Sequence, residues 1–239
     1  MHRMEKLTKV AINDFKLVFR DGSLRFFFIF PVLSLLIVKY GLPEIAEEFP
    51  VISRYISVLL MAATMQNSLM FGFIYSMVLI DEKDTKVAKV YGILPVSKFW
   101  FVIFRLIVPF LFAAVSTFVM LVLQPFYELS ILANLFYSLL AGLGAPLMVL
   151  FVATVANNKI EGMTWQKLFN LPTSLPLLAF FIPATFSFLF GILPTHWAYQ
   201  GFDRMISGDA FVIYVLVGFI YSLLLIAILA RKFSTKHFQ

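Results

Sequence analysis

Residues that could carry acid–base chemistry are sparse in this sequence. His196 and Asp203 stand seven positions apart, which puts them roughly on one face of a helix. A catalytic site needs a nucleophile or a metal as well as a base, and neither accompanies this pair. The sequence contains no cysteine, no His-Glu-x-x-His motif and no Gly-x-x-x-x-Gly-Lys-Ser/Thr loop. It therefore predicts no catalytic residue, no metal site and no ATP hydrolysis by that route in this chain.

The composition indicates a protein that lies in a lipid bilayer. Hydrophobic residues make up 61% and charged residues 13% of the chain, whereas soluble domains are about half apolar and a quarter charged. The net charge of +6 is spread in short clusters between apolar runs, so we expect no nucleic-acid partner. Glu5, Asp14 and Asp21 interrupt the first 22 residues, which excludes a cleavable signal peptide there.

Six apolar runs are long enough to cross a membrane as helices. They are Leu24–Val38, Tyr55–Ile80, Phe99–Leu123, Ile131–Ala156, Leu168–Leu189 and Phe211–Ala230. The runs are continuously apolar and do not alternate, which favours helices over a barrel. The predicted fold class is an all-α integral membrane protein with six transmembrane helices, and residues 1–239 form a single transmembrane domain.

The basic residues predict the orientation of these spans. When both ends and the loops after spans two and four are placed in the cytoplasm, the 19 lysines and arginines all lie inside except Lys39, Arg54 and Arg204. Arg105 is expected about two turns from the inner end of span three, where its side chain can snorkel. We therefore expect a multi-pass protein of the cytoplasmic (plasma) membrane with cytoplasmic N and C termini.

Residues 1–22 contain a stretch of a different kind, Lys6–Arg20. Its apolar residues recur at helical spacing, and its basic residues lie mostly elsewhere on the wheel. This pattern predicts an amphipathic interfacial helix that ends at Asp21-Gly22. The alternative is a basic flank without fixed structure.

The polar residues in the middle of the spans are neutral. Gln66, Asn67 and Ser68 lie in span two, and Ser116 and Thr117 in span three. Ion-coupled carriers usually place acidic residues or histidine inside their spans. The sequence therefore argues against a carrier driven by an ion gradient.

A charged stretch, Asp81–Lys98, separates spans two and three. Acidic residues at its start are followed by lysines and by an apolar stripe of Val87, Val90, Tyr91 and Leu94, and Pro95 then stops the helix. A short helix of this kind can lie along the membrane and present a face to a cytosolic subunit. The alternative is a solvated loop that only joins two spans.

Three segments resemble those of ABC-2-type exporter membrane subunits. Asp81-Glu82-Lys83 followed by Leu94-Pro95-Val96-Ser97-Lys98 resembles the family's coupling loop. Asn157-Asn158-Lys159-Ile160-Glu161-Gly162-Met163 is similar to its second cytosolic contact, and Leu193-Pro194-Thr195-His196-Trp197 to its approach to the last span. Two features depart from the family: Lys86-Val87-Ala88-Lys89 stands where a Gly-Thr run is common, and no nucleotide-binding domain is fused to the chain.

The resemblance implies several partners. It implies a separate ABC ATPase subunit that holds ATP and Mg, a second permease subunit in a homo- or heterodimer, and the lipid bilayer, with no cofactor in this chain. The residues expected to couple to the ATPase are Asp81, Glu82, Lys83, Lys86, Val90, Tyr91, Pro95, Asn158, Lys159, Glu161 and Gly162. Glu82 and Glu161 either contact this motor or stabilise their own turns, and Glu161 could equally cap a helix that starts after Asn157-Asn158.

Span five and the segment after it are rich in helix breakers. Pro172, Pro176 and Pro183 favour irregular helix in the bundle interior or beside a cavity. A short helix over Thr195–Ser207 is expected at the outer interface, with Trp197, Tyr199 and Phe202 at headgroup depth. With the family resemblance, this predicts short extracellular helices before the last span, as in type V exporters. The alternative is an ordinary kinked span and a plain loop.

Together, these features predict a permease subunit of an ATP-driven ABC exporter for an apolar or amphipathic cargo such as a drug, lipid or peptide. The polar content and the resemblance together place the translocation pathway at Gln66, Asn67, Ser68, Pro176 and Pro183. The alternative is a non-transporting receptor or assembly protein that binds a cytosolic partner through its loops. The third hypothesis is a membrane enzyme.

Overall fold

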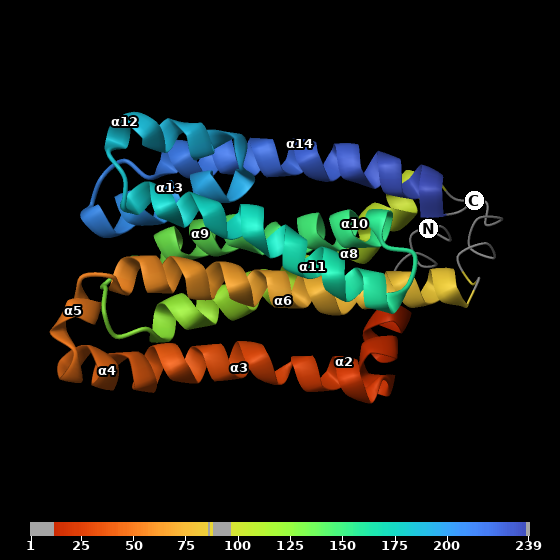
Figure 1. The fold of residues 1–239 in the computed structure, drawn as a ribbon, viewed down its shortest axis with the longest axis horizontal. Coiled ribbons are helices and arrows are strands. Elements are labelled where there is room, and N and C mark those ends of the chain that lie inside the picture. The colour runs from red at the N-terminus through yellow and green to blue at the C-terminus, as the bar shows by residue number, and fades with distance from the viewer. Residues whose placement is uncertain (1–11, 86, 88–96, 238–239) are drawn as a thin grey trace.

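The structure, a computed structural model, describes residues 12–85, 87 and 97–237. Within these ranges every regular element is a helix and none is a strand. Five segments are long and apolar enough to cross a membrane, namely Gly22–Glu48, Ile56–Asp84, Lys98–Leu123, Ile131–Val155 and Val212–Thr235. They run side by side along the long axis of the bundle (Figure 1). An all-α multi-pass membrane protein is therefore confirmed.

The first span is built from several short helices and is longer than predicted. It comprises α2 (Gly22–Phe27), α3 (Ile29–Leu36), the π-helix η1 (Ile37–Gly41) and α4 (Leu42–Glu48), and α5 (Pro50–Ser53) follows. A helix over residues 12–20 precedes it. The Asp21 carboxylate caps α2 by accepting hydrogen bonds from the Ser23 and Leu24 N–H groups. This confirms the predicted helix end at Asp21-Gly22, while the part of the predicted interfacial helix before residue 12 lies outside the described residues.

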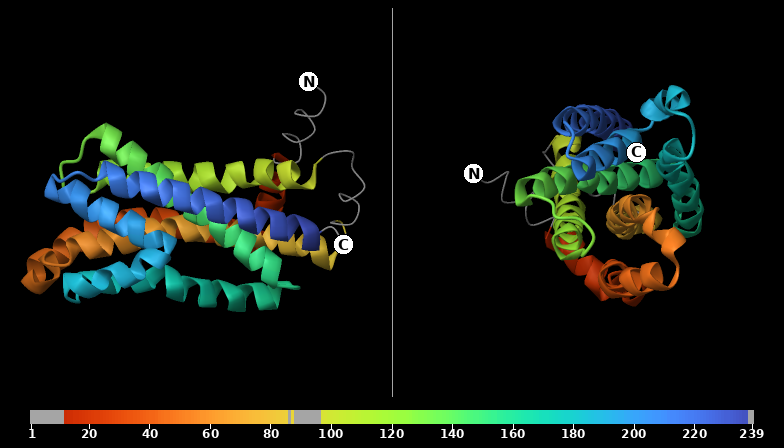
Figure 2. Two further views of the ribbon diagram at one scale, coloured as in Figure 1. Left: turned by 90° about the horizontal axis from the view of Figure 1, so that it is seen from above. Right: turned by 90° about the vertical axis from the view of Figure 1, so that its left-hand side faces the viewer.

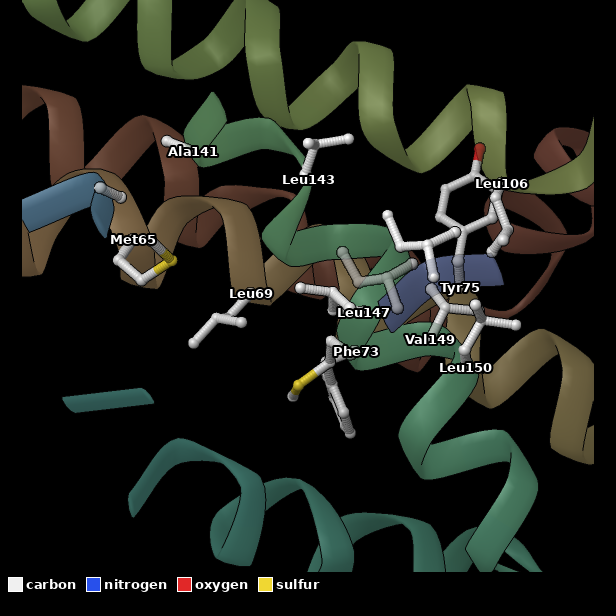
Figure 3. Packing of buried hydrophobic residues seen from close by; sticks show 14 of the residues in the cluster. Met65, Leu69, Phe73, Tyr75, Leu106, Ala141, Leu143, Leu147, Val149 and Leu150 are labelled. Carbon is white, nitrogen blue, oxygen red and sulfur yellow. The ribbon is translucent and has the colours of Figure 1, made fainter. Parts of the chain in front are cut away.

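Helix α6 (Ile56–Asp84) is the central element of the bundle. It packs against α10 (Gly144–Val155) and α8 (Lys98–Leu123), and α9 (Ile131–Gly142) covers its first half. In the end-on view α6 lies between the first span and the α9–α10 segment (Figure 2). Met65, Leu69 and Phe73 of α6 contribute to one buried cluster with Leu147 and Leu150 of α10 (Figure 3). Burial of this apolar surface in protein leaves little of α6 for lipid.

Small residues let α6 and α10 approach closely. A Cβ atom added to Gly72 would lie 2.6 Å from the Met148 Cβ and 2.7 Å from the Ala145 carbonyl oxygen. Pro146 cannot donate to the Gly142 carbonyl one turn earlier, and the chain breaks between α9 and α10 at Leu143. The Ser68 hydroxyl donates to this freed carbonyl at 3.5 Å. Pro146 thus accounts for the break between α9 and α10, and small residues allow the close packing of α10 on α6.

The fifth predicted span, Leu168–Leu189, is not one helix. It is divided among α11 (Lys159–Ser174), the 3₁₀ helix η2 (Leu175–Phe180), α12 (Ala184–Ser187) and the 3₁₀ helix η3 (Phe188–Ile192). Each proline removes a backbone donor, so regular α-helix cannot continue through Pro176 and Pro183. The described residues therefore hold five candidate spans where the sequence predicted six, and the irregularity expected of this segment is confirmed.

Aromatic side chains satisfy backbone carbonyls that the broken helix leaves free. The Tyr199 hydroxyl donates to the Thr173 carbonyl at 3.0 Å, and the Trp197 Nε1–H donates to the Gly191 carbonyl at 2.9 Å. These two residues lie on α13 (Pro194–Ser207), which confirms the predicted short helix and packs on the last span, α14 (Val212–His237). The Tyr199 and Phe202 side chains are buried inside the protein, so they do not contact the membrane surface in the way expected of interfacial aromatic residues.

Candidate functional site

Three charged side chains meet in the protein interior. Arg105 on α8 is only 4% exposed. Its Nε and Nη2 donate to the two Asp14 carboxylate oxygens at 2.5 and 2.8 Å, and Nη1 and Nη2 donate to the Glu82 oxygens at 2.8 and 2.7 Å. The guanidinium group thus forms paired hydrogen bonds with two carboxylates at once. We call Asp14, Glu82 and Arg105 the charge triad.

The charge triad joins three separate parts of the chain. Asp14 belongs to the helix over residues 12–20, Glu82 to the last turn of α6 and Arg105 to the third turn of α8. The expectation that Arg105 snorkels at the membrane boundary is wrong, because its partners are inside the protein. Sequence analysis missed Asp14, although it stands among Ala11, Phe15 and Val18 on the apolar stripe of its helix. An acidic residue on an apolar stripe is the signal that could have identified it.

Burial raises the pKa of the Asp14 carboxyl to about 6, although the Arg105 guanidinium acts in the opposite direction. Among the described residues, Tyr75 and Glu82 are further titratable groups that interact with it. Since the pKa is higher in the folded than in the unfolded state, the stability that Asp14 contributes is fully present below about pH 4 and is lost as the pH rises through about 6.

We predict that Asp14→Asn reduces the pH dependence of thermal unfolding. The parent protein should lose stability between about pH 4 and about pH 7 through this group, and the variant should lose less. The exposed Asp84→Asn is the matched control and should keep the parent's profile. Identical pH profiles for the parent and Asp14→Asn would contradict the prediction.

Lysines close to the charge triad bind other parts of the protein. The Lys159 Nζ lies 2.8 Å from an Asp81 carboxylate oxygen and 3.5 Å from one of Asp21. The Lys83 Nζ donates to the carbonyls of Ala153 and Ala156, the latter at 2.9 Å, where a helix end favours a cation. The predicted coupling residues Asp81, Lys83 and Lys159 therefore link α2, α6, α10 and α11 to one another. These links gather at the end of the bundle where α6 ends and α11 begins, which we call the basic end.

Helix α11 begins with a reciprocal cap. The Asn158 Oδ1 accepts from the Glu161 N–H at 2.9 Å, and a Glu161 carboxylate oxygen accepts from the Asn157 N–H at 2.9 Å. Of the two roles weighed for Glu161, its role as a helix cap is confirmed. A Cβ added to Gly162 would lie 2.7 Å from side-chain atoms of Ile80 and Met77, so glycine lets α11 press against the end of α6.

This cap leaves an apolar surface exposed beside it. Ile160 is 80% exposed and Met163 is 48% exposed. Sequence analysis included neither of them among the coupling residues, because a single isoleucine carries no local signal of exposure. Lys86, Val90, Tyr91 and Pro95 lie outside the described residues.

Two neighbouring cavities lie along α6 in the membrane-spanning part of the bundle. The larger, about 550 Å³, lies between α6 and the α3–α4 segment, and the smaller, about 320 Å³, lies between α6 and the segment Ser174–Leu177 with Tyr199. Ser34, Ala63 and Gln66 line both cavities.

The structure brings together only some of the predicted pathway residues. Gln66 is exposed at the boundary of the two cavities, and Asn67 lines the larger one. Ser68, Pro176 and Pro183 line neither: Ser68 and Pro176 are buried in protein contacts and Pro183 is exposed elsewhere. Gln66 and Ser68 are two positions apart on α6, a rotation of about 200° around the helix, which directs their side chains to different neighbours.

His196 and Asp203 both lie on α13. His196 is buried on α13 beside Trp197, and burial lowers the pKa of its imidazole. No group of three metal-binding side chains occurs in the described ranges.

Comparison with known proteins agrees with this helical membrane architecture. Residues 14–230 match the family described as fluoroquinolones export permease protein Rv2686c-like. The chain is 25% identical over 236 residues to the fluoroquinolones export permease proteins MT2760 and Rv2686c of two Mycobacterium tuberculosis strains, CDC 1551 / Oshkosh and ATCC 25618 / H37Rv. Each match covers 94% of this chain and 92% of the relative. No solved structure matched the chain. Because the family match covers nearly the whole sequence, the chain belongs to the family of Rv2686c-like fluoroquinolones export permeases.

Proposed function

We propose that this chain is the membrane-spanning permease subunit of an ATP-driven ABC exporter. The observation that carries the proposal is the match to export permeases over residues 14–230. The sequence has no P-loop of its own, so the energy is supplied by a separate ATPase subunit that binds ATP and Mg. A second permease subunit completes the transporter as a homo- or heterodimer.

The cargo is an apolar or amphipathic drug of the fluoroquinolone type. Two relatives carry that compound class in their names. The larger cavity is lined mainly by apolar side chains, with Ser34, Gln66 and Asn67 as its polar residues, and the smaller one adds Ser174 and Tyr199. A charged lining is not needed for such a cargo, because its aromatic body is favoured by apolar walls.

The ATPase subunit docks on the basic end. Here the capped start of α11 holds Ile160 and Met163 in an exposed position beside the Lys159–Asp81 ion pair. Placing this end in the cytoplasm of a plasma-membrane protein also puts most lysines and arginines inside. Because Lys83, Lys159 and the charge triad join this surface to α2, α6, α8 and α10, movement of the ATPase can be passed to the spanning helices.

Replacement of Ile160 tests this docking surface. We expect Ile160→Asp to reduce co-purification of the separate ATPase subunit and to lower drug export by at least about tenfold, because a carboxylate replaces an apolar contact. Val51→Asp is the matched control, since Val51 is 72% exposed at the other end of the bundle. Both variants should keep the parent's unfolding temperature. Unchanged co-purification and export in Ile160→Asp would remove this surface from the coupling role.

The second candidate function is a receptor or assembly protein that binds a cytosolic partner without transport. Such a protein would bind its partner through the same exposed residues, Ile160 and Met163. Stimulation of ATP hydrolysis by the drug in the purified complex separates the two, because only a transporter couples cargo to the nucleotide cycle.

A further inference from the structure

The larger cavity has an unusual wall. One side is formed by α3 and η1, through Ser34, Ile37 and Val38, and the other by α6. π-helical turns are rare inside α-helical spans, and those that do occur are often found at functional sites. Phe30, Leu33 and Ile37 line the cavity and are 40 to 59% exposed. The cavity is therefore open at the surface of a membrane-spanning segment.

One buried polar atom in this cavity lacks a partner. Asn67 is 2% exposed, and its Nδ2 donates to the Ser116 hydroxyl at 2.7 Å. Its Oδ1 has no hydrogen-bond partner in the described part of the chain. An unpaired amide oxygen in a low-dielectric interior is unfavourable until a donor reaches it. Asn67 lines a cavity whose other walls are mainly apolar, and its buried oxygen is an acceptor that a ligand donor could reach after rotation of this side chain.

The volume and the lining together define a ligand. About 550 Å³ is within the range of cavities that hold drug-sized molecules. The apolar walls favour an aromatic body, and Asn67 favours an N–H or O–H donor at one of its ends. Gln66 stands at the boundary with the smaller cavity, so a bound molecule lies at the start of a path around α6.

We propose that the cavity between η1 and α6 is a binding site for aromatic amphiphiles that arrive from the lipid, with the Asn67 side-chain oxygen as the acceptor for their hydrogen-bond donor. The proposal rests on the proposed function in that the bound drug is the cargo. It identifies a specific face of the permease and a specific atom. It does not depend on ATP, because binding precedes the step that the ATPase drives.

The absence of cysteine from the chain allows a direct labelling test. A single cysteine is introduced by A63C, which lies in the cavity, or by A227C, which lines a separate apolar cavity between α8 and α14. Both alanines are half-buried. The complex in membranes is labelled with a membrane-permeant maleimide, without nucleotide, in the presence or absence of ciprofloxacin. We expect the drug to slow labelling at position 63 at least about fivefold and to leave position 227 unchanged.

Matched substitutions test the role of the Asn67 oxygen. N67L removes the acceptor and should raise the ciprofloxacin concentration needed for protection by about tenfold. S116A removes only the partner of Nδ2 and should keep the parent's value. N134L is the second control, because Asn134 is also buried with an unpaired oxygen but lines neither cavity along α6.

Several results would overturn the inference. The inference is wrong if ciprofloxacin does not slow labelling at position 63, or if it slows labelling equally at position 227. It is also wrong if N67L and N134L raise the ciprofloxacin concentration needed for protection to the same extent. Cross-linking of A63C between two copies would overturn it as well, because the cavity would then be a subunit interface. Failure of the proposed function has a different signature. In that case export would not require the ATPase, while protection at position 63 would still be observed.

Discussion

Replacing Arg105 with methionine should destabilise the protein by about 3–5 kcal/mol, because the change removes a buried cation that is hydrogen-bonded to two buried carboxylates. Asp14 and Glu82 are 1% and 5% exposed, so water cannot take the place of the guanidinium group. Arg105→Lys should recover only part of the loss, since an ammonium group cannot form paired hydrogen bonds with two carboxylates. The measurement is the thermal unfolding of the purified protein in detergent.

Two control variants test whether the loss of stability comes from the charge triad. Arg231→Met replaces an exposed arginine at the basic end and should change stability little. The combined variant Asp14→Leu, Glu82→Leu, Arg105→Met removes all three charges and should regain most of the stability, because apolar replacement of a buried ion network is often neutral or favourable. An Arg105→Met protein as stable as the parent would show that the charge triad is not formed.

The substitution Gly72→Ala should disrupt the contact between α6 and α10. The new methyl group would lie 2.7 Å from the Ala145 carbonyl oxygen, which belongs to the backbone and moves only if α10 moves. Overpacking of this kind costs about 1–3 kcal/mol or more. We expect lower unfolding temperature and reduced export, measured in the same membranes.

The control for this effect is Gly22→Ala. A Cβ at Gly22 meets nothing within 4 Å, so the same chemical change adds no close contact. Should Gly72→Ala unfold at the parent's temperature, the close packing of α6 on α10 would not exist in the protein.

The positions of five spans could be predicted because the length of an apolar run is a local property of the sequence. The break between α9 and α10 could also be predicted, since Pro146 acts on its own backbone. The course of the fifth predicted span, Leu168–Leu189, could not be predicted. How the chain continues after Pro176 depends on donors from α13 such as Tyr199, which are distant in sequence.

The contacts within the candidate site also could not be predicted from local sequence. Charge and position made Glu82 and Glu161 the obvious coupling residues, yet Glu82 pairs with Arg105 and Glu161 caps α11. These contacts determine which residues face outward at the basic end, and Ile160 is one of them. The pairing of Arg105 with Asp14 joins residues 91 positions apart, which no local pattern specifies.

The central claim is that a separate ATPase drives export through this chain. The most direct measurement uses proteoliposomes that contain the permease and its ATPase, with ciprofloxacin transport followed after addition of ATP and Mg. We predict uphill accumulation that requires both subunits and is lost when the P-loop lysine of the ATPase is replaced. Accumulation by the permease alone, driven by an ion gradient without nucleotide, would contradict the account.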